Sequence, residues 1–197
     1  ELNFHVPSYQ EWYGRQDLVP TLQFHKQCLQ LLQYVNPKQH WVLKTPPYLS
    51  AMEPLLAVYP DACIIQTHRD PAQVMVSVSS LYYALHALGC DMETPQRVGK
   101  IQTENWARHL AAGMQTRQKM ADRKEQFLDV YFEELLESPV VCVEKIYRHF
   151  NMQWSDELRI KLYAFMLQND RDKHGKHQYN AAMFGLDEQV LDEVFSD

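Results

Sequence analysis

The sequence lacks a long apolar run and an excess of basic residues. No apolar stretch approaches the roughly 20 residues that a membrane-spanning helix requires, so we expect no membrane span. Lysine and arginine number 19 against 25 aspartates and glutamates, which gives a formal net charge of −6. Because a nucleic-acid-binding protein usually carries a basic stripe, we expect no nucleic-acid partner. A small basic pocket for an anionic ligand remains compatible with this charge.

Cysteine is also sparse, and its spacing fits neither a metal site nor a disulfide framework. The four cysteines are Cys28, Cys63, Cys90 and Cys142. We expect reduced thiols, which favour a reducing compartment and predict a cytoplasmic protein. The chain begins without a methionine or a signal sequence and ends within a helical pattern, so both ends look cut.

Low-complexity segments and internal repeats are absent, and glycine is rare, with six residues in 197. The composition, 46% hydrophobic and 22% charged, is typical of a globular protein. A chain of this length suits one domain with a substantial core. We therefore expect a single domain over residues 1–197.

The pattern of apolar and turn residues predicts helices that alternate with short buried strands. Helices are expected at 20–35, 49–58, 71–88, 95–123, 139–150, 155–168 and 187–195. Strands are expected at 41–44, 62–67 and 127–132. Such alternation favours an α/β fold in which helices flank a parallel sheet, with ligands bound beyond the carboxyl ends of the strands.

The strongest local signal is an arginine at the end of the second expected strand. Arg69 follows Thr67-His68, and Asp70-Pro71 is a typical helix start, with Asp70 as the N-cap. Ser77 comes eight residues after Arg69, on the same helix. The planar guanidinium can bind a phosphate in two places, and a serine hydroxyl can add a donor. Spacing alone leaves equally open that Arg69 pairs with a carboxylate and Ser77 is a small packing residue.

Three segments together resemble the sulfotransferase family, especially its bacterial-type branch. They are WVLKTPPYLSAMEPLLAVYPDACIIQTHRDPAQVMVSVSSL, FLDVYFEELLESPVVCVEKIYRHF and KHGKHQYNAAMFGLD. The resemblance runs through almost the whole chain and keeps the family order. It implies a P-loop-NTPase-like sulfotransferase fold, with a parallel sheet flanked by helices, that is N-terminally incomplete. The family's phosphosulfate-binding loop, of the type G-x-P-R-S-G-T, has no counterpart in residues 1–40.

The resemblance implies a donor and a reaction. The donor would be 3′-phosphoadenosine 5′-phosphosulfate (PAPS), and a sulfuryl group would pass to a hydroxyl or amine of a small-molecule acceptor. Arg69 and Ser77 match the family's 3′-phosphate ligands, and Lys44 matches its lysine beside the transferring sulfuryl group. Phe132 matches an aromatic residue that stacks on adenine, although core packing explains it equally well.

A basic loop near the end of the chain also resembles a family element that closes over the donor. The matching residues are Lys173, Gly175, Lys176 and His177. Solvated charge is the alternative for this loop. His174 and His177 have no acidic or cysteine partners at metal-ligand spacing, so we expect no metal.

The general base is where this sequence departs from the family. The family carries a histidine two or four residues after the lysine, but this chain has Pro46 and Tyr48. With a pKa near ~10, tyrosine is a poor base at neutral pH. His68 or a carboxylate from elsewhere is a replacement candidate, while a packed histidine is the alternative for His68.

Two further readings remain open. A non-catalytic sulfotransferase-fold subunit, serving in binding or assembly, would explain the absent loop and Tyr48. A nucleotide kinase would need a Gly-rich Lys-Ser/Thr loop and a magnesium carboxylate, and neither is visible. The sequence leaves open a homo-oligomer or a larger assembly, as well as the identity of the acceptor.

Overall fold

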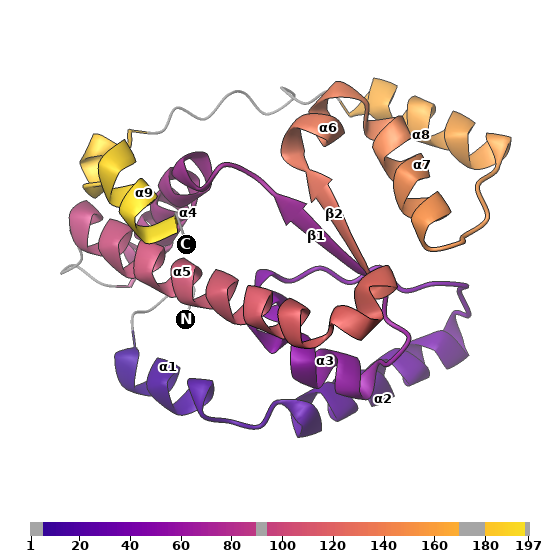
Figure 1. Ribbon diagram of the computed structural model, residues 1–197, viewed down its shortest axis with the longest axis horizontal. Coiled ribbons are helices and arrows are strands. Elements are labelled where there is room, and N and C mark those ends of the chain that lie inside the picture. The colour runs from indigo at the N-terminus through magenta and orange to yellow at the C-terminus, as the bar shows by residue number, and fades with distance from the viewer. Residues whose placement is uncertain (1–5, 90–93, 170–179, 196–197) are drawn as a thin grey trace.

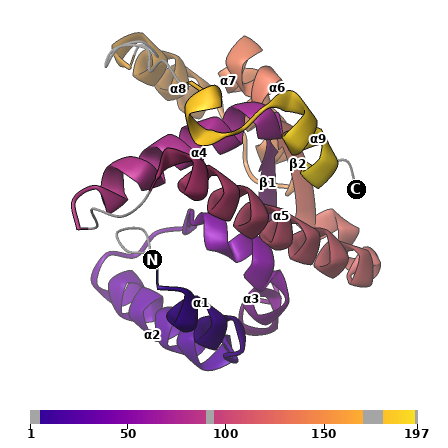
Figure 2. The same ribbon diagram turned by 90° about the vertical axis from the view of Figure 1, so that its left-hand side faces the viewer.

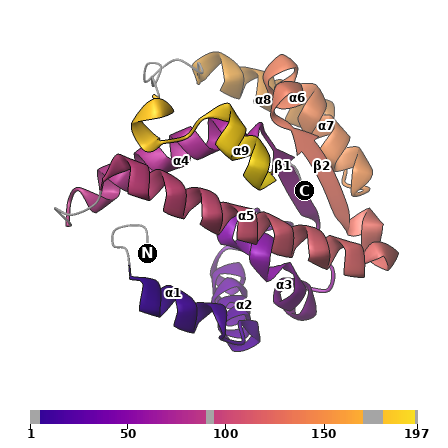
Figure 3. The same ribbon diagram turned by 60° about the vertical axis from the view of Figure 1, so that its left-hand side comes forward.

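The computed structural model describes residues 6–89, 94–169 and 180–195. Two parallel strands lie near the centre, and helices surround them (Figure 1). The helices fall into three groups around the strands (Figures 1–3). The first group is α1 (Pro7–Gly14), α2 (Val19–Val35), the 3₁₀ helix η1 (Pro46–Ala51) and α3 (Met52–Val58). The second is α4 (Pro71–His86), α5 (Pro95–Lys119), η3 (Ala182–Phe184) and α9 (Glu188–Phe195). The third is α6 (Phe132–Glu137), α7 (Pro139–His149) and α8 (Asp156–Gln168).

The sheet of the described residues contains β1 (Ile64–His68) and β2 (Phe127–Tyr131), which follows the 3₁₀ helix η2 (Ala121–Gln126). The strands are parallel, and the register pairs Ile64 with Phe127 and His68 with Tyr131. The expected parallel sheet is therefore confirmed. Both strands point their carboxyl ends in the same direction, which brings β1's exit into α4 beside β2's exit into α6.

The expected strand at 41–44 was wrong. This segment forms neither helix nor strand, and Val42 is 92% exposed. A strand exists only where a neighbour accepts and donates backbone hydrogen bonds, and no strand of the described residues pairs with this segment. Apolar composition alone could not supply that partner.

The start of α4 follows its expected cap, whereas other helix boundaries differ from the expected ones. The Asp70 carboxylate accepts a hydrogen bond from the Ala72 amide at 2.9 Å, and Pro71 opens α4 as predicted. The helix expected at 95–123 ends at Lys119, where the chain tightens into η2. The helix expected at 49–58 starts later, because η1 occupies its first turn. The sequence did not predict α1 or α6.

Small apolar clusters join the groups of helices. Met75 and Val76 of α4 pack with Phe184 of η3 and with two leucines, Leu186 and Leu191. A second cluster of Leu22, Leu55 and Val58 joins α2 to α3, and a third of Met52, Leu56 and Phe127 joins α3 to β2. These clusters fix α4 and β2, whose ends carry the residues of interest.

The long helix α5 lies between α4 with α9 on one side and the α1–α3 group on the other (Figures 2 and 3). Close approach is possible at Gly99, where an added Cβ would lie 2.1 Å from the Phe184 carbonyl oxygen. Glycine at this position therefore lets η3 sit directly on α5.

Candidate functional site

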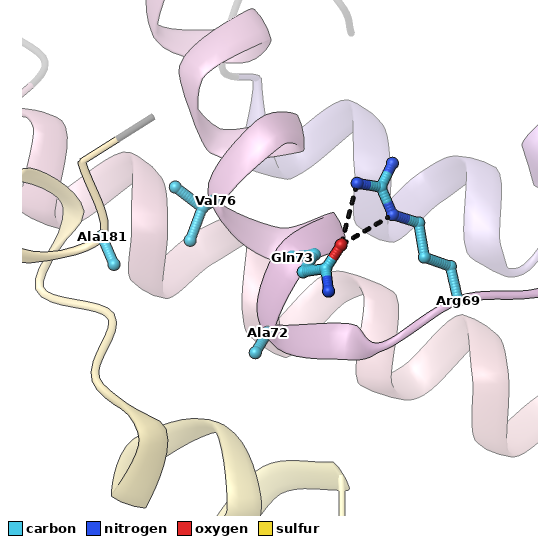
Figure 4. Close-up of a pocket in the computed structure, with 5 residues that line it drawn as sticks. All are labelled: Arg69, Ala72, Gln73, Val76 and Ala181. Carbon is cyan, nitrogen blue, oxygen red and sulfur yellow. Dashed lines mark hydrogen bonds between the residues drawn. The ribbon is translucent and has the colours of Figure 1, made fainter. Parts of the chain in front are cut away.

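The candidate site begins at the exit of β1, where Arg69 separates the strand from α4. Asp70 caps the helix and does not pair with Arg69. The Arg69 guanidinium instead donates to the Gln73 side-chain oxygen, from Nε at 3.3 Å and from Nη2 at 3.0 Å (Figure 4). Gln73 lies in the first turn of α4, four residues after Arg69, so the helix itself presents the Gln73 amide to Arg69.

Phe132, the first residue of α6, supports the same guanidinium from the other strand end. The Arg69 guanidinium carbon lies 4.3 Å from the centre of the Phe132 ring, which is a cation–π contact. The two strand exits are therefore brought together, as the sequence predicted. Because the guanidinium covers one face of Phe132, only the opposite face of the ring is left for an adenine, and adenine stacking stays a prediction.

A pocket of about 390 Å³ opens beside this arginine (Figure 4). Its lining combines one charged and one amide side chain with small apolar ones: Arg69, Ala72, Gln73, Val76 and Ala181. No carboxylate of the described residues pairs with Arg69. The arrangement can therefore bind an anion, because no described carboxylate neutralises the guanidinium and Gln73 uses only two of its N–H donors.

Ser77 lies one helical turn beyond Gln73 and is half-buried. It shares a helical face with Gln73, since residues four apart on a helix are neighbours. The lining of the pocket does not include Ser77. Its role as a phosphate ligand remains a prediction.

His68, at the last position of β1, belongs to a polar network that the sequence did not reveal. Its Nε2 lies 2.6 Å from Oδ1 of Asp129, on β2, and its ring stacks on Tyr131 at 5.2 Å between centres. Arg117 of α5 donates to both oxygens of Asp129, at 2.6 and 2.8 Å, and to the Gln66 side chain at 2.9 Å. Two strands and a helix are thus joined through one carboxylate.

The hydrogen bonds from Arg117, together with the one from His68, hold the pKa of the Asp129 carboxyl well below its usual range, against the opposing effect of burial. An ionised carboxylate can only accept hydrogen bonds, so His68 Nε2 carries the hydrogen. In the neutral imidazole the lone pair is then on Nδ1. The network therefore sets the tautomer of His68.

The two other candidates from the sequence, Lys44 and Tyr48, lie just before η1 and within it. Lys44 is exposed just before η1 and makes no hydrogen bond or ion pair with any described residue. Tyr48 is half-buried in η1 and packs against the cluster of Leu22, Leu55 and Val58. Packing explains Tyr48 in this structure, and its catalytic role remains untested.

The predicted donor-closing residues Lys173, Gly175, Lys176 and His177 lie outside the described residues. The chain is described again from residue 180, and Ala181 lines the Arg69 pocket. In sequence, these four residues come shortly before a residue that lines the pocket.

Three cysteines fall within the described parts, Cys28, Cys63 and Cys142, and all are free thiols, as predicted for them. Throughout the described ranges, no three or more His, Cys, Asp or Glu side chains gather as metal ligands would. Each helix placed by the structure is too short or too polar to cross a bilayer.

Two parallel strands define an α/β protein, and their exits bring Arg69 beside a pocket at the strand ends, which is where such folds usually bind ligands. A profile of the sulfotransferase family matches residues 4–156, which is most of the chain. The chain belongs to the sulfotransferase family.

Two similar solved structures are consistent with this family assignment. Sulfotransferase STF1 from Mycobacterium tuberculosis H37Rv is 33% identical, with a TM-score of 0.86. The fold is also similar to that of sulfotransferase STF9 from Mycobacterium avium, at 23% identity and a TM-score of 0.88. Each comparison covers 99% of this chain and 50% of the other, so the chain spans half the length of these enzymes. A comparison with curated protein sequences found no match.

Proposed function

We propose that this chain is part of an enzyme that transfers a sulfuryl group from PAPS to a hydroxyl or amine of a small molecule. The observation that supports it is Arg69, whose guanidinium rests on Phe132, has no carboxylate partner among the described residues and opens on a pocket. This environment suits the 3′-phosphate, the group that distinguishes PAPS from common nucleotides. Ser77 is assigned as a further donor to that phosphate.

The donor would supply an already activated sulfuryl group. The protein then has to bind and orient the donor and the acceptor, and to neutralise the charge that develops during transfer. Lys44 is assigned to the charge that develops on the bridging oxygen. His68 is the better candidate for the base, because its Nδ1 lone pair is fixed by Asp129, whereas Tyr48 is held in an apolar cluster. Lys173, Gly175, Lys176 and His177 are assigned to the donor by resemblance alone.

Calorimetry with 3′-phosphoadenosine 5′-phosphate tests the proposal without requiring the acceptor. We expect binding by the chain and a loss of about 10- to 100-fold in Arg69→Ala, since one charge-assisted contact is removed. Arg123→Ala is the matched control, because Arg123 is an exposed arginine in η2, away from the pocket, and its removal should leave binding unchanged. Absence of binding by the unsubstituted protein contradicts the proposal.

A further inference from the structure

Gln73 binds one edge of the Arg69 guanidinium and leaves the rest of it available. Its oxygen accepts from Nε and Nη2 at 3.3 and 3.0 Å. A guanidinium carries five N–H donors, so three remain for a ligand. Both side chains line the same pocket, and the Phe132 ring covers the guanidinium face. The Arg69 guanidinium thus has contacts along one edge and on one face that do not depend on a ligand.

The neutral charge of Gln73 matters as much as its geometry. A glutamate at this position could accept the same two hydrogen bonds, but it would neutralise the guanidinium and repel a phosphate. The carboxylate nearest in sequence, that of Asp70, accepts a hydrogen bond from the Ala72 amide and caps α4. The site therefore keeps a positioning partner for Arg69 that adds no negative charge.

The stability of α4 alone would favour glutamate rather than glutamine at position 73. Gln73 is the third residue of α4, where a negative side chain interacts favourably with the helix N-terminus. A capping box accepts glutamate or glutamine at this third position. A carboxylate would therefore suit α4 itself at least as well as glutamine, so the stability of α4 does not require the neutral side chain.

We infer that Gln73 is a positioning residue that orients Arg69 for a phosphate monoester while leaving the guanidinium charge uncompensated. The inference rests on the proposed function and adds a residue that the family resemblance did not assign. It explains how an exposed arginine becomes ordered for an anion without a carboxylate.

The test uses calorimetry with 3′-phosphoadenosine 5′-phosphate on two variants of Gln73. Gln73→Glu keeps the shape and adds a charge, and it should weaken binding by about 10- to 100-fold, as expected for the loss of a charge-assisted contact. Gln73→Ala removes the positioning but keeps the free charge, and it should weaken binding by about two- to tenfold. Adenosine 5′-phosphate, which has no 3′-phosphate, should bind both variants as it binds the unsubstituted protein.

Gln30→Glu is the matched control, because it makes the same charge change on the exposed surface of α2, outside the pocket. Thermal unfolding completes the design: Gln73→Glu should unfold at the same or a higher temperature, so weaker binding would not reflect a damaged fold.

Three outcomes are decisive. If Gln73→Glu binds the bisphosphate as tightly as the unsubstituted protein while Arg69→Ala does not, the charge argument is overturned and the proposed function stands. If Gln73→Ala matches the unsubstituted protein, positioning is overturned. If the unsubstituted protein binds no bisphosphate, the proposed function itself fails.

Discussion

Replacing Asp129 by asparagine should destabilise the fold through one carboxylate that joins β1, β2 and α5. Asp129 accepts from Arg117 at 2.6 and 2.8 Å and from His68 at 2.6 Å. Asparagine offers one acceptor oxygen, and its NH₂ group would face a donor. Breaking a fully buried pair costs about 3–5 kcal/mol, and an exposed pair about 0–1. The Asp129 and Arg117 side chains are 36% and 21% exposed, so we expect about 1–3 kcal/mol.

A double-mutant cycle with Arg117→Met, measured by urea unfolding at pH 7, isolates the pair. We expect a coupling of about 1–2 kcal/mol, and a value below about 0.5 would refute the network. Glu157→Gln is the control, because its ion pair with Lys161 is exposed on α8 and should leave the midpoint unchanged.

The pH dependence of the same variant has a defined sign. The folded-state pKa of Asp129 is lowered, so its stabilisation is fully present above the ordinary carboxyl pKa of ~3.9. It is lost as the pH falls from there through the lower folded-state value. The difference between the unsubstituted protein and Asp129→Asn should therefore be constant near neutral pH and shrink below about pH 4.

Two further predictions concern packing and capping. Gly99→Ala should lower the thermal midpoint, because its Cβ would meet the Phe184 carbonyl oxygen at 2.1 Å; Ala112→Gly on the same helix is the control, with a cost of only about 1 kcal/mol. An unchanged midpoint for Gly99→Ala would show that η3 does not pack as described. Asp70→Ala should cost about 1 kcal/mol by removing the cap of α4, while Asp70→Asn should retain most of it; equal losses in chemical denaturation would contradict a capping role.

Much of the fold could be predicted because its signals are local. Asp70-Pro71 determines the start of α4 through a carboxylate and a fixed backbone angle that act within one turn. The β1 and β2 segments were predicted from short apolar runs with turn residues at their ends. The run at 41–44 has the same composition and forms no strand, because pairing depends on a neighbour rather than on the segment.

The candidate site divides in the same way. Arg69 and Phe132 were placed at strand ends by sequence, and parallel pairing then brings them within contact. Gln73 could have been found from its spacing, since it is four residues from Arg69 at a helix start. Nothing local indicates that His68 meets Asp129, which lies 61 residues later.

By itself the sequence determined the family, the helix starts and the arginine at the end of β1, because these depend on residue order and neighbours within a turn. Only the tertiary structure decided which groups surround that arginine and that histidine. Hydrogen bonds and ring contacts act over a few ångströms, and the docking of β1, β2 and α5 determines which side chains come that close.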